Sequence, residues 1–262
     1  MDSTVNFGPS AFTERVWRML ERIDYRRAES PEDKDAIYRL RYDAYMREGA
    51  IEPDVSGRFT DPFDDVSNVW IIGMFIDGEL ASSIRFHVAD AEDAPLPAQT
   101  VFPDILGPRL RRGQIIVDPT RFVTRLDFSR RFHEMPYLTV RPGWMAGEFF
   151  GADFILATIR SEHQGYYRRV FGHEVWSGAR DYPTLKKPIA CMGLDYFAVR
   201  DQVEQRYPFY KSSASERARL FERSSNPHAP KSQATSWRDS ATPPSAARNS
   251  LGLPTDSAMV AG

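Results

Sequence analysis

The sequence has few of the residues that build metal centres and disulfide frameworks. It contains one cysteine, Cys191, and five histidines in 262 residues. A single thiol cannot close an internal disulfide, and the histidines show no metal-ligand spacing such as His-x-x-x-His. We therefore expect no disulfide, no metal site and no tightly bound cofactor, and we expect a reducing, cytoplasmic compartment.

Long apolar runs and an excess of one charge are also missing. No stretch approaches the about 20 apolar residues that cross a bilayer. The 34 basic residues are balanced by 36 acidic ones, which gives a formal net charge of -2. The sequence thus predicts no membrane span and gives no electrostatic reason to expect nucleic-acid binding. With 42% hydrophobic and 13% aromatic residues, it can fill a globular core.

Composition divides the chain into three parts. Phe12, Val16 and Leu20 follow helical spacing, which predicts an amphipathic helix within residues 1–22. Residues 23–221 carry the apolar patterns of one folded domain. Residues 222–262 are rich in Ser, Pro and Ala with little apolar periodicity, which predicts a disordered tail.

Local signals in the central part predict a mixed α/β sheet flanked by helices. Ser30 and Pro31 mark a helix start, and Gly49 marks its end. Asp77-Gly78 is a hairpin turn signal between strands at 69–75 and 80–88. Further strands are expected at 24–28, 114–123, 154–159, 174–179 and 189–197, further helices at 141–150 and 162–171, and an irregular segment at 90–112.

Carboxylates and arginines lie in or beside three of these strands. Asp61 and Asp64 precede the hairpin, Arg85 lies in its second strand, and Asp118 and Arg121 lie in the next strand. Because Pro119 removes a ladder donor, that strand should splay or bulge. Taken alone, each of these carboxylates and arginines most often has a structural role. If they converge, they form an ionic cluster that can grip a zwitterionic amine and shift its pKa.

Five short motifs follow one another along the chain, and their combination is more specific than any one of them alone. They are Arg41-x-x-x-Tyr45, Asp61-x-x-Asp64, Ile84-Arg85-Phe86, Phe102-Pro103 and Asp118-x-x-Arg121-Phe122. In this set the sequence resembles the acyl-homoserine lactone synthases and the N-acyl amino acid synthases (FeeM-like), over roughly residues 25–199. The resemblance implies the α/β fold of the Gcn5-related N-acetyltransferases (GNAT), in one domain.

The resemblance also implies an activity. It implies transfer of a long-chain fatty acyl group from an acyl carrier protein thioester to the amine of an amino acid or related small amine. The implied catalytic residues are Asp61, Asp64 and Asp118, and the implied substrate-binding residues are Arg41, Tyr45, Arg85 and Arg121. Asp118 is the candidate base, or alternatively a salt-bridge partner of Arg121 or Arg85, and Asp61 and Asp64 are expected to hold the substrate ammonium. A working base needs a pKa raised above the ordinary value near 3.9.

The expected contacts with the acyl donor come from two further sets. Acyl-chain contacts are expected from Phe86, Phe102, Phe122, Trp144 and Phe150, although such aromatics are first of all core residues. Contacts with an acidic carrier protein are expected from Arg109, Arg111, Arg112, Arg130 and Arg131, although such a run is usually a solvated face. Residues 141–147 lack the Gln/Arg-x-x-Gly-x-Gly/Ala register of coenzyme A users, which favours the carrier over coenzyme A as co-substrate.

Two alternatives stay open. The first is an acyl-homoserine lactone synthase that uses S-adenosylmethionine. The sequence departs from those enzymes at Ile51, Phe59 and Asp118, where they carry Trp, Glu and Glu, and this favours an amino acid acceptor. The second is a non-catalytic acyl-binding or regulatory module in which the ionic cluster only stabilises the fold.

Overall fold

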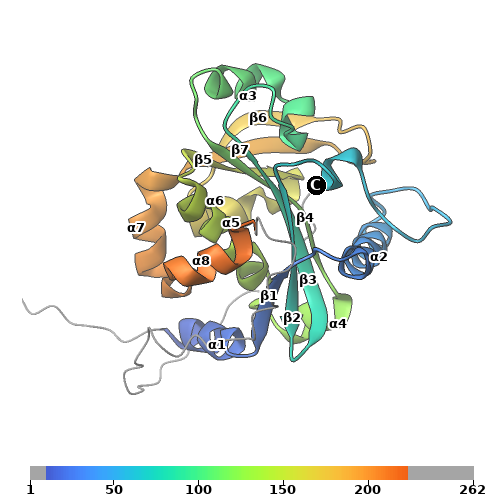
Figure 1. Cartoon of the computed structure of the whole chain (residues 1–262), viewed down its shortest axis with the longest axis vertical. Helices are drawn as coiled ribbons and strands as arrows, with labels where there is room; N and C mark the ends of the chain where they lie inside the picture. Colours follow the sequence, from blue (N-terminus) through green and yellow to red (C-terminus); the bar gives the residue numbers. More distant parts are fainter. Residues whose placement is uncertain (1–9, 224–262) are drawn as a thin grey trace, which may run out of the picture.

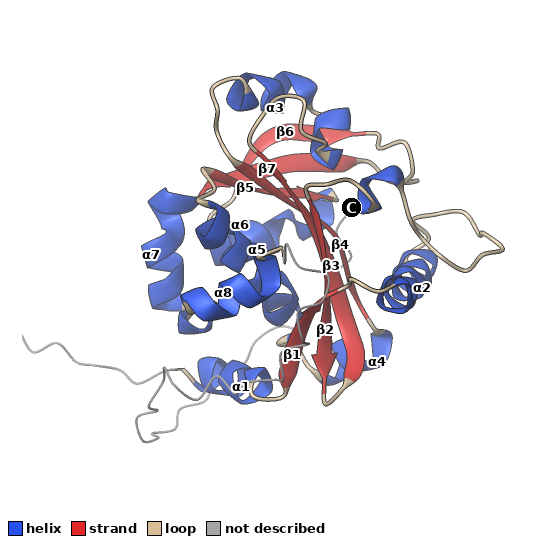
Figure 2. Cartoon of the chain, viewed as in Figure 1, coloured by secondary structure: helices blue, strands red, loops and turns tan. Residues whose placement is uncertain are grey.

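One mixed sheet organises the protein. The computed structural model describes residues 10–223 and has a seven-stranded sheet of order β1-β2-β3-β4-β5-β7-β6 (Figures 1 and 2). The strands are β1 (Ile23–Arg27), β2 (Val69–Ile76), β3 (Glu79–Ala89), β4 (Ile116–Thr124), β5 (Phe154–Ile159), β6 (Glu174–Arg180) and β7 (Ile189–Asp195). Among these seven strands, β4 and β5 pair in parallel and all other neighbours pair antiparallel. The predicted mixed α/β sheet is confirmed.

Helices cover both faces of the sheet. They are α1 (Ala11–Leu20), α2 (Pro31–Arg47), α3 (Pro103–Leu110), α4 (Leu126–Arg131), α5 (Met135–Phe150), α6 (Gln164–Phe171), α7 (Tyr196–Arg206) and α8 (Ala214–Phe221), with short 3-10 turns η1 (Pro62–Asp64), η2 (Pro97–Thr100), η3 (Ser161–His163) and η4 (Pro208–Tyr210). Figure 1 shows α5 to α8 on one face and α2 on the other. Among residues 10–223, no helix is long and apolar enough to cross a membrane.

The local signals at the helix start and the hairpin are confirmed. The Ser30 side chain accepts a hydrogen bond from the Asp33 amide, and Pro31 is the first residue of α2. At the β2–β3 turn, Asp77 and Gly78 have φ of 51° and 87°. Positive φ at both central residues matches the strand twist of a two-residue hairpin.

Strand β4 has two irregularities, one on each side. Its parallel pairing with β5 is confined to Ile116↔Phe154 and Val117↔Ile155, so the two strands separate from Asp118 onward. Its pairing with β3 shifts register between Ser83 and Arg85, opposite Arg121, whose φ is 54°. The irregularity predicted at Asp118-Pro119 is confirmed on the β5 side, whereas the bulge on the β3 side lies at Arg121.

Two predictions about helices were wrong at segments that contain proline. Residues 90–112 are not irregular throughout, because Pro103 occupies the first turn of α3, where a missing N–H costs nothing. The helix expected at 141–150 begins at Met135 and contains Pro142. Pro142 cannot donate to the Leu138 carbonyl, and the Tyr25 hydroxyl donates to that oxygen instead, at 2.7 Å. The helix continues because a side chain replaces the lost donor.

The C-terminal part also differs from the prediction. The strand expected at 189–197 ends at Asp195, whose side chain accepts from the Ala198 amide and caps α7. Helices α4, α7 and α8 were not predicted. Helix α8 packs on α5 and β1. The predicted tail lies, from residue 224 onward, outside the described residues.

Candidate active site

A 3-10 turn before the hairpin fixes two carboxylates. Asp61 is the N-cap of η1, and its Oδ1 accepts from the Phe63 amide at 3.0 Å. Asp64 completes a capping box, since its Oδ2 accepts from the Asp61 amide at 3.0 Å. Pro62 supplies the φ of the first turn residue. The Asp-x-x-Asp motif therefore builds its own turn and leaves Asp64 Oδ1 and Asp61 Oδ2 unused by it, while Asp61 Oδ1 can accept a second hydrogen bond.

Those oxygens bind three buried arginines. Asp64 Oδ1 lies 2.7 Å from Arg41 Nη1 and 3.0 Å from Arg85 Nη1. Asp61 Oδ1 lies 2.6 Å from Arg85 Nη1, and its Oδ2 lies 2.5 Å from Arg121 Nη2. All five side chains are at most 4% exposed. We call them the ionic cluster (Arg41, Asp61, Asp64, Arg85 and Arg121). Of the five residues whose convergence the sequence left conditional, Asp61, Asp64, Arg85 and Arg121 come together here, and Asp118 does not join their ion pairs.

The bulge in β4 is what brings Arg121 into the cluster. Successive residues of a regular strand point to opposite faces of the sheet. Thr120 lies opposite Arg85 in the register and accepts from its Nε at 3.1 Å, so a regular strand would turn Arg121 away. The left-handed backbone at Arg121 turns its side chain to the same face instead. The rings of Phe59 and Tyr45 lie 4.4 and 5.5 Å from its guanidinium carbon.

The two aspartates of the cluster are held as carboxylates. Burial alone would raise the pKa of Asp61, but the charges and hydrogen bonds of Arg121 and Arg85 outweigh burial and hold that pKa below its ordinary value. The pKa of Asp64 is lowered in the same way, against burial, by Arg41 and Arg85. Three arginines face two carboxylates, and Arg121 Nη1 is buried without a hydrogen-bond partner among the described residues. The cluster thus carries an excess of positive charge.

Asp118 lies on the same face of the sheet but outside this network. It is fully buried, and within residues 10–223 no arginine or lysine lies within salt-bridge distance of it. Its Oδ2 accepts from the Ala98 amide at 3.0 Å, and its Oδ1 accepts from the Thr158 hydroxyl at 3.4 Å. Burial raises the pKa of Asp118 to about 7, although the Ala98 amide, Arg85 and Thr158 oppose the rise. Such a carboxylate can exchange a proton near neutral pH.

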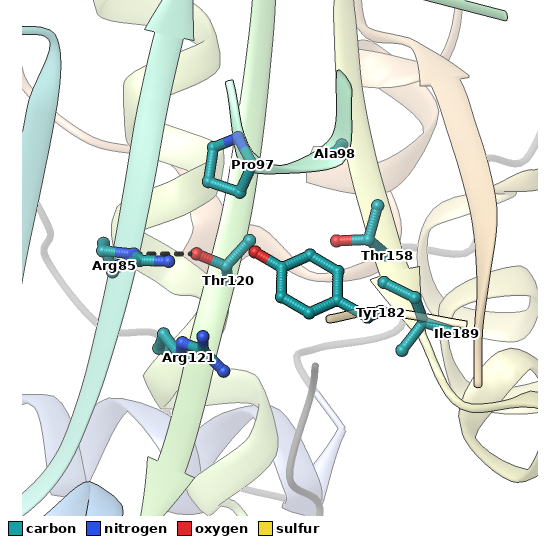
Figure 3. A pocket seen from close by; sticks show the side chains of 8 residues that line it. All are labelled: Arg85, Pro97, Ala98, Thr120, Arg121, Thr158, Tyr182 and Ile189. Atoms are coloured by element: carbon teal, nitrogen blue, oxygen red, sulfur yellow. Dashed lines mark hydrogen bonds between the residues drawn. The ribbon is translucent and has the colours of Figure 1, made fainter. Parts of the chain in front are cut away.

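A narrow hollow, too tight in this structure to admit a water-sized sphere, lies between the ionic cluster and Asp118. We call it the site hollow; its lining residues are Arg85, Pro97, Ala98, Thr120, Arg121, Thr158, Tyr182 and Ile189 (Figure 3). Figure 3 shows the Tyr182 ring reaching across from the β6–β7 loop towards β4. The same loop contacts the cluster, since Thr184 Oγ1 lies 3.4 Å from Arg121 Nη2. The site is therefore formed by β3, β4, β5, β7, η2 and this loop.

Several residues of this site were missed in the sequence analysis. Thr120 and Thr158 carry hydroxyls into the site hollow, and Tyr182 closes it. His87 lies opposite Asp118 in the β3–β4 register, and burial lowers its pKa to about 3, so its ring is neutral. The alternation of β3 and β4 could have placed Thr120 and His87. Nothing in the sequence near Tyr182 signals its place, because it comes from a loop distant in the chain.

The aromatic residues expected to line an acyl tunnel do not share one space. Phe86, Phe122 and Trp144 are buried in the core between the sheet and α5, and Phe150 is partly buried against it. Phe102 belongs to a separate core cluster formed by η2 and α3. None of them lines the site hollow. The five residues therefore do not surround one space, and contact between any of them and an acyl chain stays a prediction.

The arginines expected to bind a carrier also separate. Arg109, Arg111 and Arg112 lie at the end of α3, whereas Arg130 and Arg131 lie in α4, at the opposite end of the molecule (Figure 1). The five arginines therefore do not form one surface, and contact of either group with a carrier protein stays a prediction.

The two groups of arginines differ in their partners. Arg109 stacks on Trp176 at 3.9 Å, and Arg111 pairs with Glu92. Arg130 and Arg131 are exposed, and no carboxylate of the described chain lies within salt-bridge distance of either. Within residues 10–223, Arg130 and Arg131 are therefore both free of ion pairs, and so is Arg112 in the α3 group, which bonds Gln114 instead.

The segment compared above with a coenzyme A loop is not a loop. Arg141 to Gly147 lie within α5, and Arg141 Nε donates to the Phe209 carbonyl at 2.7 Å. The N-cap of α5 is Glu134, which is buried and pairs with Arg15 at 2.7 Å. Within residues 10–223, no group of three or more His, Cys, Asp or Glu residues is arranged to hold a metal ion.

The sheet order, the opening between β4 and β5 and the flanking helices define the class: a GNAT-like acyltransferase fold. The family model of N-acyl amino acid synthase FeeM matches residues 36–195, and the chain belongs to this family. None of the curated proteins is similar to it.

Solved structures agree with this fold. FeeM, an N-acyl amino acid synthase from uncultured soil microbes, superposes with a TM-score of 0.58 at 18% identity, covering 71% of this chain and 97% of that one. BjaI, a CoA-dependent acyl-homoserine lactone synthase, gives 0.52 at 16% identity, covering 71% and 89%. TofI, solved with an inhibitor and MTA, gives 0.50 at 15% identity, covering 72% and 100%.

Proposed function

We propose that the protein is an N-acyl amino acid synthase that transfers a fatty acyl group from a thioester to the amine of an amino acid. The proposal rests on one observation: the two sides of the site hollow differ in charge. One side presents Arg85 and Arg121 of the positively charged ionic cluster, and behind the other side lies Asp118, which has no ion pair within residues 10–223. An amino acid carries an anionic and an amine group that match these two sides.

The cationic side binds the acceptor carboxylate. Within residues 10–223, Arg121 Nη1 has no hydrogen-bond partner, and the Arg121 side chain lines the site hollow. A buried guanidinium N–H left unpaired costs free energy, which a bound carboxylate recovers through charge-assisted hydrogen bonds. Asp61 and Asp64 then act by holding the arginines, since arginines already occupy the carboxylate oxygens that the sequence suggested for the substrate ammonium.

Asp118 is the base that makes the amine reactive. An amino acid arrives as an ammonium, and its nitrogen must lose a proton before it can attack the thioester carbonyl. With a pKa raised to about 7 by burial, Asp118 is a better proton acceptor than an ordinary aspartate. Beyond Asp118 the backbone of β4 is no longer paired with β5. We assign polarisation of the thioester carbonyl to backbone N–H groups at this opening.

An acyl carrier protein is the proposed donor, and it docks at α4. The carboxylate of Glu134 at the start of α5 disfavours an anionic pyrophosphate there. Helix α4 directly follows β4, at the end where β4 and β5 diverge, and its exposed Arg130 and Arg131 suit an acidic protein surface. We assign the acyl chain to the α5 side of the sheet, near Phe86 and Phe122.

The test is reconstitution with defined components. Acyl carrier thioester, a mixture of amino acids and S-adenosylmethionine are incubated with the protein, and products are identified by mass spectrometry beside an Asp118→Asn control. N-acyl amino acids formed only by the wild-type protein support the proposal and identify the acceptor. Acyl-homoserine lactone with methylthioadenosine would instead show the lactone synthase reaction. No product with any thioester would favour the non-catalytic module.

A further inference from the structure

The buried position of Asp118 creates a problem for the proposed reaction. Its side chain is not among those that line the site hollow, and the backbone of η2 covers one of its oxygens through the Ala98 amide. A base must contact the proton that it takes, directly or through one intervening group. Some group must therefore connect Asp118 with a substrate amine in the hollow.

Thr158 is placed to make this connection. It lines the site hollow, it is 1% exposed, and its hydroxyl donates to Asp118 Oδ1 at 3.4 Å. Thr158 lies on β5, beyond the last residue pair with β4, so this contact bridges the opening between the two strands. Figure 3 shows its hydroxyl directed from β5 towards Thr120 and Tyr182, into the hollow.

The other polar groups nearby have different partners. The Thr120 hydroxyl accepts from Arg85 Nε at 3.1 Å. His87 Nε2 lies 2.9 Å from the Phe63 carbonyl oxygen, on the side of η1. Among the lining side chains of the described protein, only Thr158 is hydrogen-bonded to Asp118.

We propose that Thr158 relays the proton from the acceptor amine to Asp118. This inference rests on the proposed function. The substrate ammonium gives a proton to Thr158 Oγ1 while the hydroxyl proton of Thr158 passes to Asp118 Oδ1. The neutral amine then attacks the thioester carbon, the C–S bond breaks, and the leaving thiolate takes the second proton of the attacking nitrogen. Asp118 finally returns its proton to solvent, so the products are amide, thiol and one released proton.

The chemistry of a hydroxyl suits this step. A threonine hydroxyl donates one hydrogen bond and accepts others at the same time, so it can receive one proton as it passes on another. The 3.4 Å separation is long for a hydrogen bond between oxygens, and catalytic hydrogen bonds commonly shorten when substrate binds. Valine at position 158 keeps the shape of the side chain and removes only this function.

The experiment compares Thr158→Val and Thr158→Ser with Asp118→Asn in the acyl-transfer assay. Thr139→Val is the matched control, because Thr139 is another buried threonine, bonded to Ser82 at 2.6 Å and absent from the site hollow. We expect Thr158→Val to lower kcat about 100-fold, the scale of general base catalysis, and Thr158→Ser to restore it to within about threefold. The Asp118→Asn/Thr158→Val pair should be no worse than Asp118→Asn alone.

The pH dependence separates a relay from a structural role. Above the pKa of the acceptor amine the substrate arrives neutral, so the deficit of Thr158→Val should shrink there. A constant deficit at all pH values, or equal losses in the Val and Ser variants, would overturn the relay. Wild-type activity in Thr158→Val beside an inactive Asp118→Asn would overturn the relay alone. A wild-type protein without acyl transfer would overturn the proposed function as well.

Discussion

Asp118 and Asp61 are both buried aspartates, and their surroundings push their pKa values in opposite directions. Asp61 faces two arginines, which keep it ionised. Asp118 meets an amide and a hydroxyl but no cation at salt-bridge distance, so burial dominates and raises its pKa to about 7. Two carboxylates whose pKa values are shifted in opposite directions can have different roles. Asp61 stays ionised and holds the arginines, and Asp118 accepts a proton.

Replacing Asp118 tests its role as base. We expect Asp118→Asn to lower kcat by about 100-fold or more, since general base catalysis contributes on that scale. In the wild-type protein kcat should rise with pH through about 7, as Asp118 loses its proton, and the variant should lack this rise. A pH–rate profile of both proteins checks the expectation, and an unchanged profile in the variant would contradict it.

The same residue links stability to pH. The pKa of Asp118 is higher in the folded than in the unfolded protein, so its contribution to stability is fully present below about pH 4 and is lost as pH rises through about 7. Asn at this position does not titrate. Urea unfolding at about pH 5 and pH 8 should therefore show Asp118→Asn gaining stability relative to wild type at the higher pH.

Asp61 should matter for folding as well as for activity. Asp61→Asn leaves Arg85 and Arg121 without their shared counter-charge in a buried site, and we expect a loss of about 3–5 kcal/mol. Asp65→Asn is the matched control in the same loop. Asp65 pairs with Lys34 but is 78% exposed, so its loss should cost at most about 1 kcal/mol. Equal losses in chemical denaturation would show that the ionic cluster does not stabilise the fold.

At the scale of elements, Tyr25 compensates for a proline inside α5. Tyr25→Phe should leave the Leu138 carbonyl buried and unpaired, at a cost of about 1–3 kcal/mol. Pro142→Ala restores a backbone donor to that carbonyl. The cost of Tyr25→Phe should therefore be smaller in the Pro142→Ala background, which a double-mutant cycle of unfolding free energies measures. Additive costs would contradict this account.

Elements were predictable where a local rule decides the conformation. Ser30-Pro31 and Asp77-Gly78 act within four residues, and both predictions are confirmed. Helices α7 and α8 also have local signals, the caps Asp195 and Ser213, which the sequence analysis did not use. Helix α5 was predicted too short because its proline is rescued by Tyr25, a residue far away in the sequence.

The candidate site was predictable in part for the same reason. Regular alternation along β3 and β4 puts Arg85 and Asp118 on one face. The bulge that adds Arg121 to this face has no sequence signal, because arginine is not a residue typical of left-handed backbone. Tyr182 reaches the site through the path of a long-range loop, which no local pattern encodes.

At the scale of the whole molecule, the separation of the two arginine groups gives a test of donor docking. We expect Arg130→Gln/Arg131→Gln to raise KM for the acyl carrier thioester about 10-fold, with little change in kcat, because the pair attracts the acidic carrier but does not touch the reacting atoms. Arg111→Gln/Arg112→Gln removes the same charge from the opposite end of the sheet and should leave KM unchanged.

Ionic strength and a donor without the carrier protein give two further tests of docking at α4. Because screening weakens attraction between exposed charges, the wild-type KM for the carrier thioester should rise with ionic strength, and the Arg130→Gln/Arg131→Gln variant should lose most of that dependence. With a short acyl thioester that lacks the carrier protein, the variant and the wild-type protein should have the same KM. An equal rise in KM for both donors would mean that the α4 arginines act on the site itself, and carrier docking would then have to be sought on another surface.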